Sequence, residues 1–204
     1  KYLIKKKTLY LYNYKSFNEM EYGIPREFIR LEPNELLYLK EQAQKSKKGI
    51  VEIGRYFGGS TTVLNFANKN VPIYSIDLNP QDDVFLKNIL ENINKNHKTE
   101  LIISDSQKSN FRKITDYDLL FIDGDHSYEG CLADLNNWWE NLSLNGDILL
   151  HDSYKADKNG VADSISDFIK SKGNNIKVIN FPSKLTKWQS FRTKFGSLTH
   201  LRKI

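Results

Sequence analysis

Short apolar, β-branched runs alternate with longer segments of helical period from Gly49 onward. The runs expected as strands are 50–53, 71–77, 101–103, 118–123 and 147–152. Apolar residues recur three or four positions apart, the spacing of an amphipathic helix, in the segments 61–68, 84–93 and 131–142. This alternation predicts an α/β fold, a Rossmann-like doubly wound sheet that is mostly parallel and has helices on both faces.

The end of the chain predicts one more helix and two antiparallel strands. Residues 161–169 have helical period and are followed by Gly173, a common helix stop. The runs 176–181 and 188–195 are expected to form an antiparallel hairpin, because a loop of about six residues is too short for a helical crossover. Before Gly49, a helix is expected over 34–45. We therefore divide the chain into an N-terminal flank, residues 1–48, and one domain, residues 49–204.

Composition excludes several classes of protein. The 204 residues, 39% of them hydrophobic and 27% charged, suit one globular domain. No apolar run approaches the roughly 20 residues of a membrane span. The single cysteine, Cys131, cannot form an internal disulfide, so the cytoplasm is the expected compartment. The net charge of +5 is interpreted as solvated surface lysine, because no recognised nucleic-acid module is present.

A glycine-containing turn between the first expected strand and its helix predicts a small-molecule site. Residues 52–60 read EIGRYFGGS, which places backbone amides and the positive end of a helix at the edge of the sheet. The glycines do not have the G-x-G-x-x-G spacing of a dinucleotide site, and no P-loop Gly-Lys-Ser/Thr follows. The acidic Glu52 instead suits a cationic ligand, such as one with an ammonium or sulfonium group.

Two further strand ends extend this pattern. Asp77 ends the second strand, where a carboxylate can accept hydrogen bonds from both ribose hydroxyls, and 104–106 (SDS) follow the third. With the E-x-G-x-x-x-G loop, these residues resemble the S-adenosylmethionine site of class I methyltransferases, over residues 49–154. The resemblance implies an S-adenosyl-L-methionine-dependent methyltransferase domain at 49–204. The implied cofactor-binding residues are Glu52, Gly54, Arg55, Tyr56, Gly58, Gly59, Ser60, Asp77, Leu78, Asp105, Ser106 and Asp123.

The fourth and fifth strands end in acids and histidines. Residues 121–130 read FIDGDHSYEG, and 149–154 read LLHDSY. Neighbouring parallel strands lie about 5 Å apart, so Asp123 and Asp152 repel each other unless a proton or a metal intervenes. Oxygen ligands of this kind suit Mg²⁺. The alternative is that strand-end acids cap the following helix, the role expected for Asp125.

The D-G-x-H and H-D pairs resemble a subgroup of small-molecule O-methyltransferases that includes antibiotic-sugar methyltransferases, and are similar to cephalosporin hydroxylase-like proteins. The resemblance implies that Asp123 and Asp152 are ligands of Mg²⁺ (or Mn²⁺). His151, at a position that is acidic in some members, is the third expected ligand. His126 is the expected general base, with Asp123 as the other catalytic residue. The implied reaction is metal-assisted O-methylation of a sugar, polyol or other small molecule.

Three other functions stay open. The first is a hydroxylase-like or non-methylating relative that binds a nucleoside on the same fold. The second is a nucleic-acid methyltransferase, although no Asn-Pro-Pro-aromatic motif for base amines is present. The third is a non-catalytic binding module whose acids cap helices. The first 22 residues contain five tyrosines, and this flank is interpreted as a lid or a homo-oligomer contact.

Overall fold

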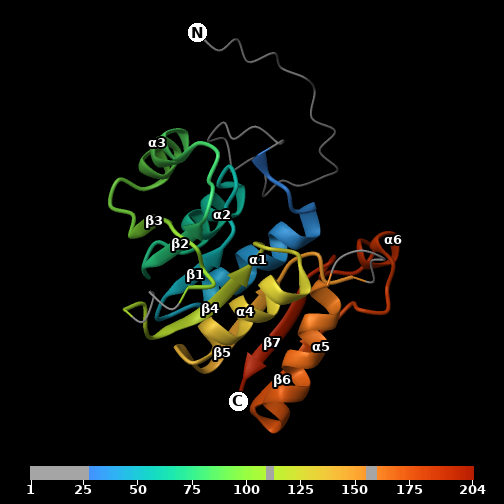
Figure 1. Cartoon of the computed structure of the whole chain (residues 1–204). Helices are drawn as coiled ribbons and strands as arrows, with labels where there is room; N and C mark the ends of the chain where they lie inside the picture. Colours follow the sequence, from blue (N-terminus) through green and yellow to red (C-terminus); the bar gives the residue numbers. More distant parts are fainter. Residues whose placement is uncertain (1–27, 109–112, 155–159) are drawn as a thin grey trace.

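The computed structural model describes residues 28–108, 113–154 and 160–204. They form a seven-stranded sheet in the order β3-β2-β1-β4-β5-β7-β6 (Figure 1). The strands are β1 (Ile50–Ile53), β2 (Ile73–Asp77), β3 (Thr99–Ile103), β4 (Tyr117–Ile122), β5 (Leu142–Leu150), β6 (Ile176–Asn180) and β7 (Thr199–Lys203). The helices are α1 (Pro33–Lys45), α2 (Gly59–Ala67), α3 (Asp83–Ile93), α4 (Tyr128–Trp139), α5 (Val161–Lys172) and α6 (Lys187–Ser190), and the 3-10 turn η3 (Gly173–Asn175) follows α5.

The first five strands are parallel, and β7 pairs antiparallel with both β5 and β6. The sheet is thus the predicted Rossmann-like, mostly parallel one, with an antiparallel C-terminal end. The strand order reverses between β1 and β4. In open α/β sheets, ligands bind at the carboxyl ends of the strands beside such a switch point. The loops after β1, β4 and β5 therefore form the candidate site.

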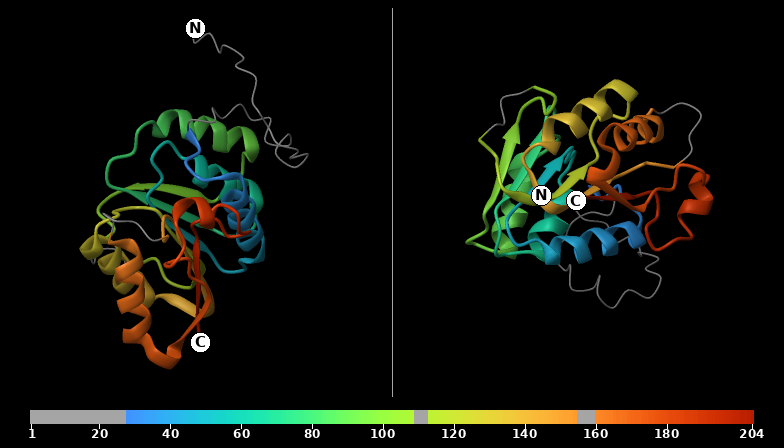
Figure 2. Two further views of the ribbon diagram at one scale, coloured as in Figure 1. Left: turned by 90° about the vertical axis from the view of Figure 1, so that its right-hand side faces the viewer. Right: turned by 90° about the horizontal axis from the view of Figure 1, so that it is seen from below.

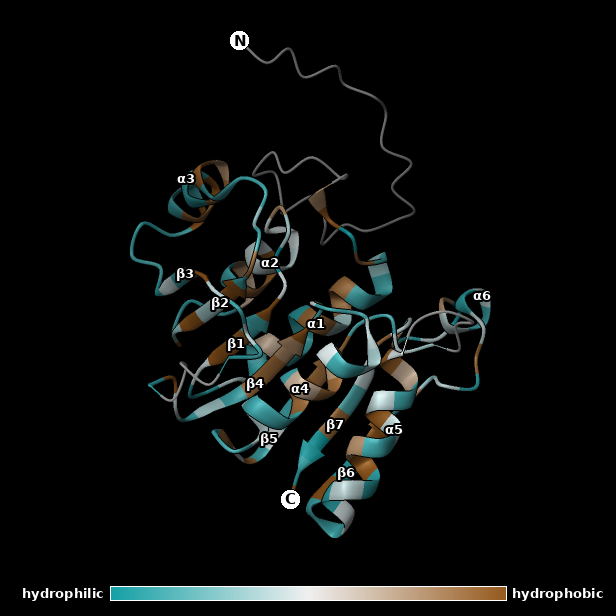
Figure 3. Cartoon of the chain, in the orientation of Figure 1, coloured by the Kyte–Doolittle hydropathy of each residue, from teal (hydrophilic) through white to brown (hydrophobic). Residues whose placement is uncertain are grey.

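Helices cover both faces of the sheet. Helices α4 and α5 pack on one face and α1 and α2 on the other (Figure 2). Each face has its own hydrophobic cluster, and apolar sides of the helices turn toward the sheet (Figure 3). The central strand β4 is buried on both faces, as its unbroken apolar run predicts. Trp138 and Trp139 of α4 are core residues rather than ligand contacts.

The predicted strand 188–195 is wrong. Residues 187–190 form helix α6, which Thr186 caps by accepting a hydrogen bond from the Gln189 backbone amide, while the Gln189 side chain accepts one from the Thr186 amide. This capping box stabilises a helical turn locally, and the apolar residues nearby do not outweigh it. The strand that pairs with β6 is β7. The antiparallel arrangement was predicted correctly, but with the wrong partner.

Two boundaries also differ from the predictions. The helix expected over 131–142 is α4, which begins at Tyr128 and ends at Trp139, while Leu142 begins β5. Ser127 caps α4 by accepting a hydrogen bond from the Gly130 amide. The pairing of β5 with β4 has an irregularity between Leu142 and Asp147. All five tyrosines of residues 1–22 lie outside the described residues. None of the helices described is long and apolar enough to cross a membrane.

Candidate active site

Gly54 allows the loop after β1 to touch the end of β4. Its backbone has a φ of 83°, in the left-handed region, and a Cβ there would collide with the carbonyl oxygen of Asp123 and lie 2.8 Å from Cα of Gly124. The Gly54 amide donates to the Ile76 carbonyl at 2.8 Å, so the turn is also bonded to β2. Only glycine fits this position without moving the backbone that carries Asp123.

The rest of the glycine loop is tightly packed. A side chain at Gly58 would collide with Leu86 of α3, and one at Gly59 would collide with the Phe28 carbonyl. The loop thus lies between α3 and the segment before α1. The amides at the start of α2 have no partners within the helix, which is a general property of helix N-termini. The contact of these glycines with S-adenosylmethionine, the methyl donor, stays a prediction.

Asp77 fastens the glycine loop to β2. Its Oδ2 accepts hydrogen bonds from the amides of Arg55 and Tyr56 at 2.8 and 2.9 Å, and its Oδ1 accepts one from Asn79 at 2.7 Å. A carboxylate has about four acceptor sites, so one acceptor site of Asp77 is left open by these three bonds. The next residue, Leu78, is 68% exposed and offers an apolar surface beside that carboxylate.

Glu52 lies beneath the loop and is enclosed by protein. It accepts hydrogen bonds from the hydroxyls of Ser60, Thr61 and Ser75, at 2.5, 2.6 and 2.6 Å. Burial raises the pKa of Glu52, against the lowering effect of these three hydroxyls. Glu52 and Ser60 therefore join α2 to β1 and β2, and direct contact of either with a donor stays a prediction.

The side chain of Arg55 points into the protein. It is 2% exposed, and its guanidinium makes a bidentate pair with Asp83 at 2.8 and 2.6 Å. The same group donates to the carbonyls of Ser75 and Ile102. Every one of these contacts is structural, so only the backbone of Arg55 is placed near the expected donor. The side chain of Tyr56 is 39% exposed and lines the cleft described below.

Helix α4 holds the loop after β3. Ser106 donates to the carboxylate of Asp134 at 2.7 Å, and the Ser106 carbonyl accepts from the Trp138 indole at 3.1 Å. Asn137 donates to the Gln107 carbonyl at 2.6 Å. Asp134 is fully buried, and burial raises its pKa to about 6. The sequence analysis did not identify Asp134. An acidic residue on the otherwise apolar face of α4 could have indicated it. Asp105 forms an ion pair with Lys108 at 3.1 Å.

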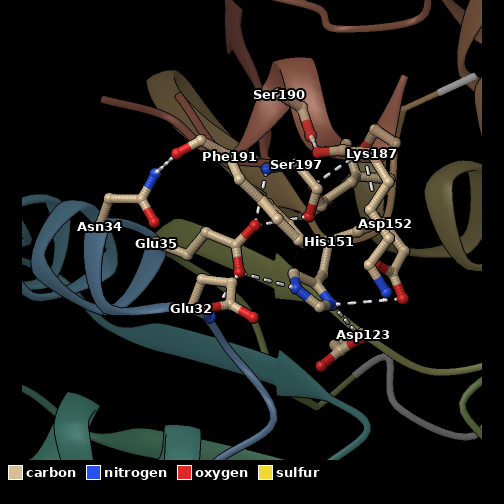
Figure 4. A network of polar contacts seen from close by, with 12 residues as sticks. Glu32, Asn34, Glu35, Asp123, His151, Asp152, Lys187, Ser190, Phe191 and Ser197 are labelled. Carbon is tan, nitrogen blue, oxygen red and sulfur yellow. Dashed lines mark hydrogen bonds and ion pairs between the residues drawn. The ribbon is translucent and has the colours of Figure 1, made fainter. Parts of the chain in front are cut away.

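The expected acid and histidine residues do meet at the ends of β4 and β5, together with an unexpected one. His151 is buried between two carboxylates (Figure 4). Its Nδ1 lies 3.0 Å from Asp123 Oδ1, and its Nε2 lies 3.1 Å from Glu35 Oε2. Burial lowers the pKa of His151, but the charge of Asp123 and the two hydrogen bonds outweigh it, so the pKa is raised well above 6.5.

His126 is the more accessible histidine of the site. Its side chain is 44% exposed, with Nε2 3.4 Å from Asp123 Oδ1 and Nδ1 3.9 Å from Asp152 Oδ2. The hydrogen bond to Asp123 and the charges of both acids raise the pKa of His126. Burial would raise the pKa of Asp123, but the charge of His151 and the hydrogen bonds from both histidines hold it well below its usual range. Asp123 is thus an ionised partner for both rings.

A cleft of about 460 Å³ opens above this cluster. Its walls include five residues that sequence reasoning did not assign to the site: Arg30, Glu32, Glu35, Lys187 and Phe191. Arg30 lies over the Tyr56 ring, 5.0 Å from its centroid, and Lys187 lies 5.6 Å from that of Phe191. These residues come from the segment around α1 and from α6 with the residue that follows it, so the cleft depends on contacts between distant parts of the chain.

The expected metal ligands Asp123, Asp152 and His151 lie together, but their arrangement does not fit a cation. Histidine coordinates a metal through a nitrogen that carries no proton. Both nitrogens of His151 instead face carboxylate oxygens at hydrogen-bond distance. Across the three described ranges, no group of three or more His, Cys, Asp or Glu side chains is placed to hold a metal ion. These three side chains, as they are arranged, do not fit the expected Mg²⁺ (or Mn²⁺).

Comparison with known proteins shows the family of this chain and the class of its fold. The family model described as a methyltransferase domain matches residues 51–153. An O-methyltransferase from Bacillus cereus, solved in complex with S-adenosylhomocysteine, has a TM-score of 0.66 and 14% identity, covering 88% of this chain and 86% of its own. A methyltransferase from Podospora anserina, also bound to S-adenosylhomocysteine, has a TM-score of 0.64 and 17% identity, with coverages of 93% and 85%.

A TDP-rhamnose 3′-O-methyltransferase of calicheamicin biosynthesis has a TM-score of 0.57 and 15% identity, covering 94% of this chain and 96% of its own. At these identities, the structural similarities show the fold. No curated protein matches this chain in sequence. The family model covers half of the chain, from β1 to the end of β5, which includes the glycine loop and the acid-histidine cluster. The chain belongs to this methyltransferase-domain family and is a class I S-adenosylmethionine-dependent methyltransferase.

Proposed function

We propose that this enzyme methylates a hydroxyl group of a sugar, polyol or related small molecule, with His126 as the general base. One observation carries the proposal: an accessible histidine lies beside an ionised aspartate in the cleft at the carboxyl ends of β4 and β5. A base in this place can reach the hydroxyl proton of a molecule bound in the cleft. Methyl transfer to oxygen needs such a base.

The donor fits the edge of the sheet next to the cleft. The amides at the start of α2 and the loop at Gly54 would receive its methionine part, the open acceptor site of Asp77 would take a ribose hydroxyl, and Ser106 would border the adenine. The donor supplies an electrophilic methyl group on a sulfonium. The hydroxyl oxygen forms a bond to this carbon as the carbon–sulfur bond breaks, which leaves S-adenosylhomocysteine.

His126 takes the proton that the hydroxyl loses in this step. The ring accepts it on a nitrogen, and the ionised Asp123 stabilises the resulting positive charge. The cleft walls combine carboxylates, histidines and cations, which suit a polar acceptor rich in hydroxyls. The calicheamicin enzyme with the same fold acts on a TDP-sugar, which supports a sugar as the acceptor class.

A methyl-transfer assay tests the proposal. Purified enzyme with methyl-labelled S-adenosylmethionine is incubated with neutral sugars, sugar nucleotides, polyols, catechols and RNA, and products are identified by mass spectrometry. We expect a methyl ether on a sugar or polyol hydroxyl. Methylation confined to RNA or catechols would contradict the acceptor class. Binding of S-adenosylhomocysteine without transfer to any acceptor would favour the non-methylating alternative, and stabilisation by NAD alone would contradict the donor.

The rate should depend on pH through His126. As a base, His126 must be neutral, and its pKa is raised above 6.5 by Asp123 and Asp152. We expect kcat to fall tenfold for each pH unit below that raised pKa and to be constant above it. In Asp123→Asn, the midpoint of the kcat profile should move to lower pH, because a hydrogen bond and a negative charge beside the ring are removed. A profile that is flat between pH 5 and 9 would contradict this role.

A further inference from the structure

The hydrogen bonds of Glu35 fix the direction of its contact with His151. Glu35 is fully buried on the first turn of α1. Its Oε1 accepts from the amide and the hydroxyl of Ser197, at 2.6 and 2.7 Å. Its Oε2 accepts from the Glu32 amide at 2.7 Å and faces His151 Nε2 at 3.1 Å. Burial would raise the pKa of Glu35, but the His151 ring and the two Ser197 donors outweigh it and lower the pKa, so the carboxylate is ionised and the ring donates to it.

The second nitrogen of the His151 ring is also a donor. Nδ1 lies 3.0 Å from Asp123 Oδ1 and 3.7 Å from Asp152 Oδ2. Asp123 is ionised, so a hydrogen on Nδ1 satisfies this contact. A ring that donates through both nitrogens carries a positive charge. This charge lies between acids from three elements: Glu35 from α1, Asp123 after β4 and Asp152 after β5.

We infer that the charged ring of His151, positioned by Glu35, replaces a divalent cation between the strand-end carboxylates, and that methyl transfer in this enzyme needs no divalent metal. The inference deepens the proposed function and rests on it. Asp123 and Asp152 would repel each other without a cation. The ring supplies that charge from within the chain, and it leaves Asp123 ionised beside His126.

The structure around Glu35 is built to keep the ring in this place. A Cβ at Gly196 would lie 2.5 Å from Glu35 Oε1, so the loop before β7 packs directly on the carboxylate. The Ser197 carbonyl in turn accepts from the Ser153 amide at 3.0 Å, which joins this loop to the segment after His151. Glu35 lies outside residues 51–153, which the family model matches. It is therefore a positioning residue contributed by the flank.

Metal binding to the full chain tests the inference without donor or acceptor. Mn²⁺ binding is measured by electron paramagnetic resonance for the wild type and for His151→Asp, which exchanges the internal cation for a third carboxylate. We expect the variant to bind Mn²⁺ at least tenfold more tightly than the wild type. The control His97→Asp makes the same change outside the cleft and should bind like the wild type. One tightly bound Mn²⁺ in the wild type, lost in Asp123→Asn, would overturn the inference.

A second measurement keeps the inference testable if His151→Asp does not fold. Nitrogen NMR of histidine-labelled wild-type protein should show both nitrogens of His151 protonated at pH 7.5. Glu35→Gln should end this state, and Glu35→Asp should partly restore it. A neutral His151 ring in the wild type would overturn the inference.

Activity measurements with and without metal distinguish a failure of this inference from a failure of the proposed function. Once an acceptor is known, EDTA should leave kcat within twofold. Loss of more than tenfold that Mg²⁺ or Mn²⁺ restores would overturn metal independence while leaving O-methylation intact. Absence of any methylated sugar or polyol would contradict only the proposed function, because the Mn²⁺ and NMR results do not depend on it.

Discussion

Replacing His126 with alanine is expected to lower kcat by about 10²- to 10⁴-fold, the usual contribution of a general base. The ring is the accessible base of the cleft, and its removal leaves the hydroxyl proton to water. Affinity for S-adenosylhomocysteine should change less than threefold, because the proposed donor site lies along β1, β2 and α2. Calorimetric binding of S-adenosylhomocysteine and steady-state kinetics on the same preparation would check both expectations.

Two comparisons make the His126 result interpretable. The side chain is 44% exposed, so its loss should leave the melting temperature close to that of the wild type. The matched control is His97→Ala, which removes a histidine outside the cleft and should leave kcat unchanged. If His126→Ala keeps more than a third of wild-type kcat, the base must be another residue, and the proposed mechanism fails.

Gly54→Ala should cause the largest loss of stability among single substitutions in the site, about 3–5 kcal/mol in the free energy of unfolding. The added methyl group collides with the Asp123 carbonyl, and alanine must adopt a φ of 83°. Both costs arise from backbone, which cannot move without separating the ends of β1 and β4. Urea unfolding followed by circular dichroism would measure the loss.

Gly173→Ala is the control for the conformational part of this cost. Gly173 has a φ of 53°, but a Cβ there has no atom within 4 Å. Its substitution should cost about 1–3 kcal/mol, the backbone strain of alanine at a φ of 53° and a ψ of −121° without any steric contact. Equal losses in the two variants would mean that the contact between Gly54 and Asp123 is not tight, and the geometry assigned to the glycine loop would be wrong.

Local patterns in the sequence predicted most of the fold. The unbroken apolar run in β4 indicated a strand buried on both faces, and the spacing of apolar residues located α3, α4 and α5. The prediction failed at 188–195, where aromatic residues resembled a strand but Thr186 and Gln189 cap a helical turn. The pairing of β7 with both β5 and β6 was not predicted from the sequence and is known only from the structure.

The sequence indicated which residues of neighbouring strand ends lie together, and it did not indicate the cleft residues that come from α1 and α6. Asp123, His126, His151 and Asp152 meet as expected because parallel strands end at one edge. Arg55 was expected to bind S-adenosylmethionine, and because its side chain pairs with Asp83 inside the protein, only its backbone lies at the glycine loop. The sequence carries no mark that distinguishes an arginine buried with a carboxylate from one that faces a ligand.

The sequence by itself determined the α/β fold, the glycine loop and the acid-histidine pairs, because each is written in neighbouring residues or in the period of a single element. Only the tertiary structure decided the state of the cluster. It brought Glu35 from α1 to within 3.1 Å of His151, 116 positions further along the chain. Contacts between residues so distant depend on how helices pack across the sheet, and no local pattern encodes them.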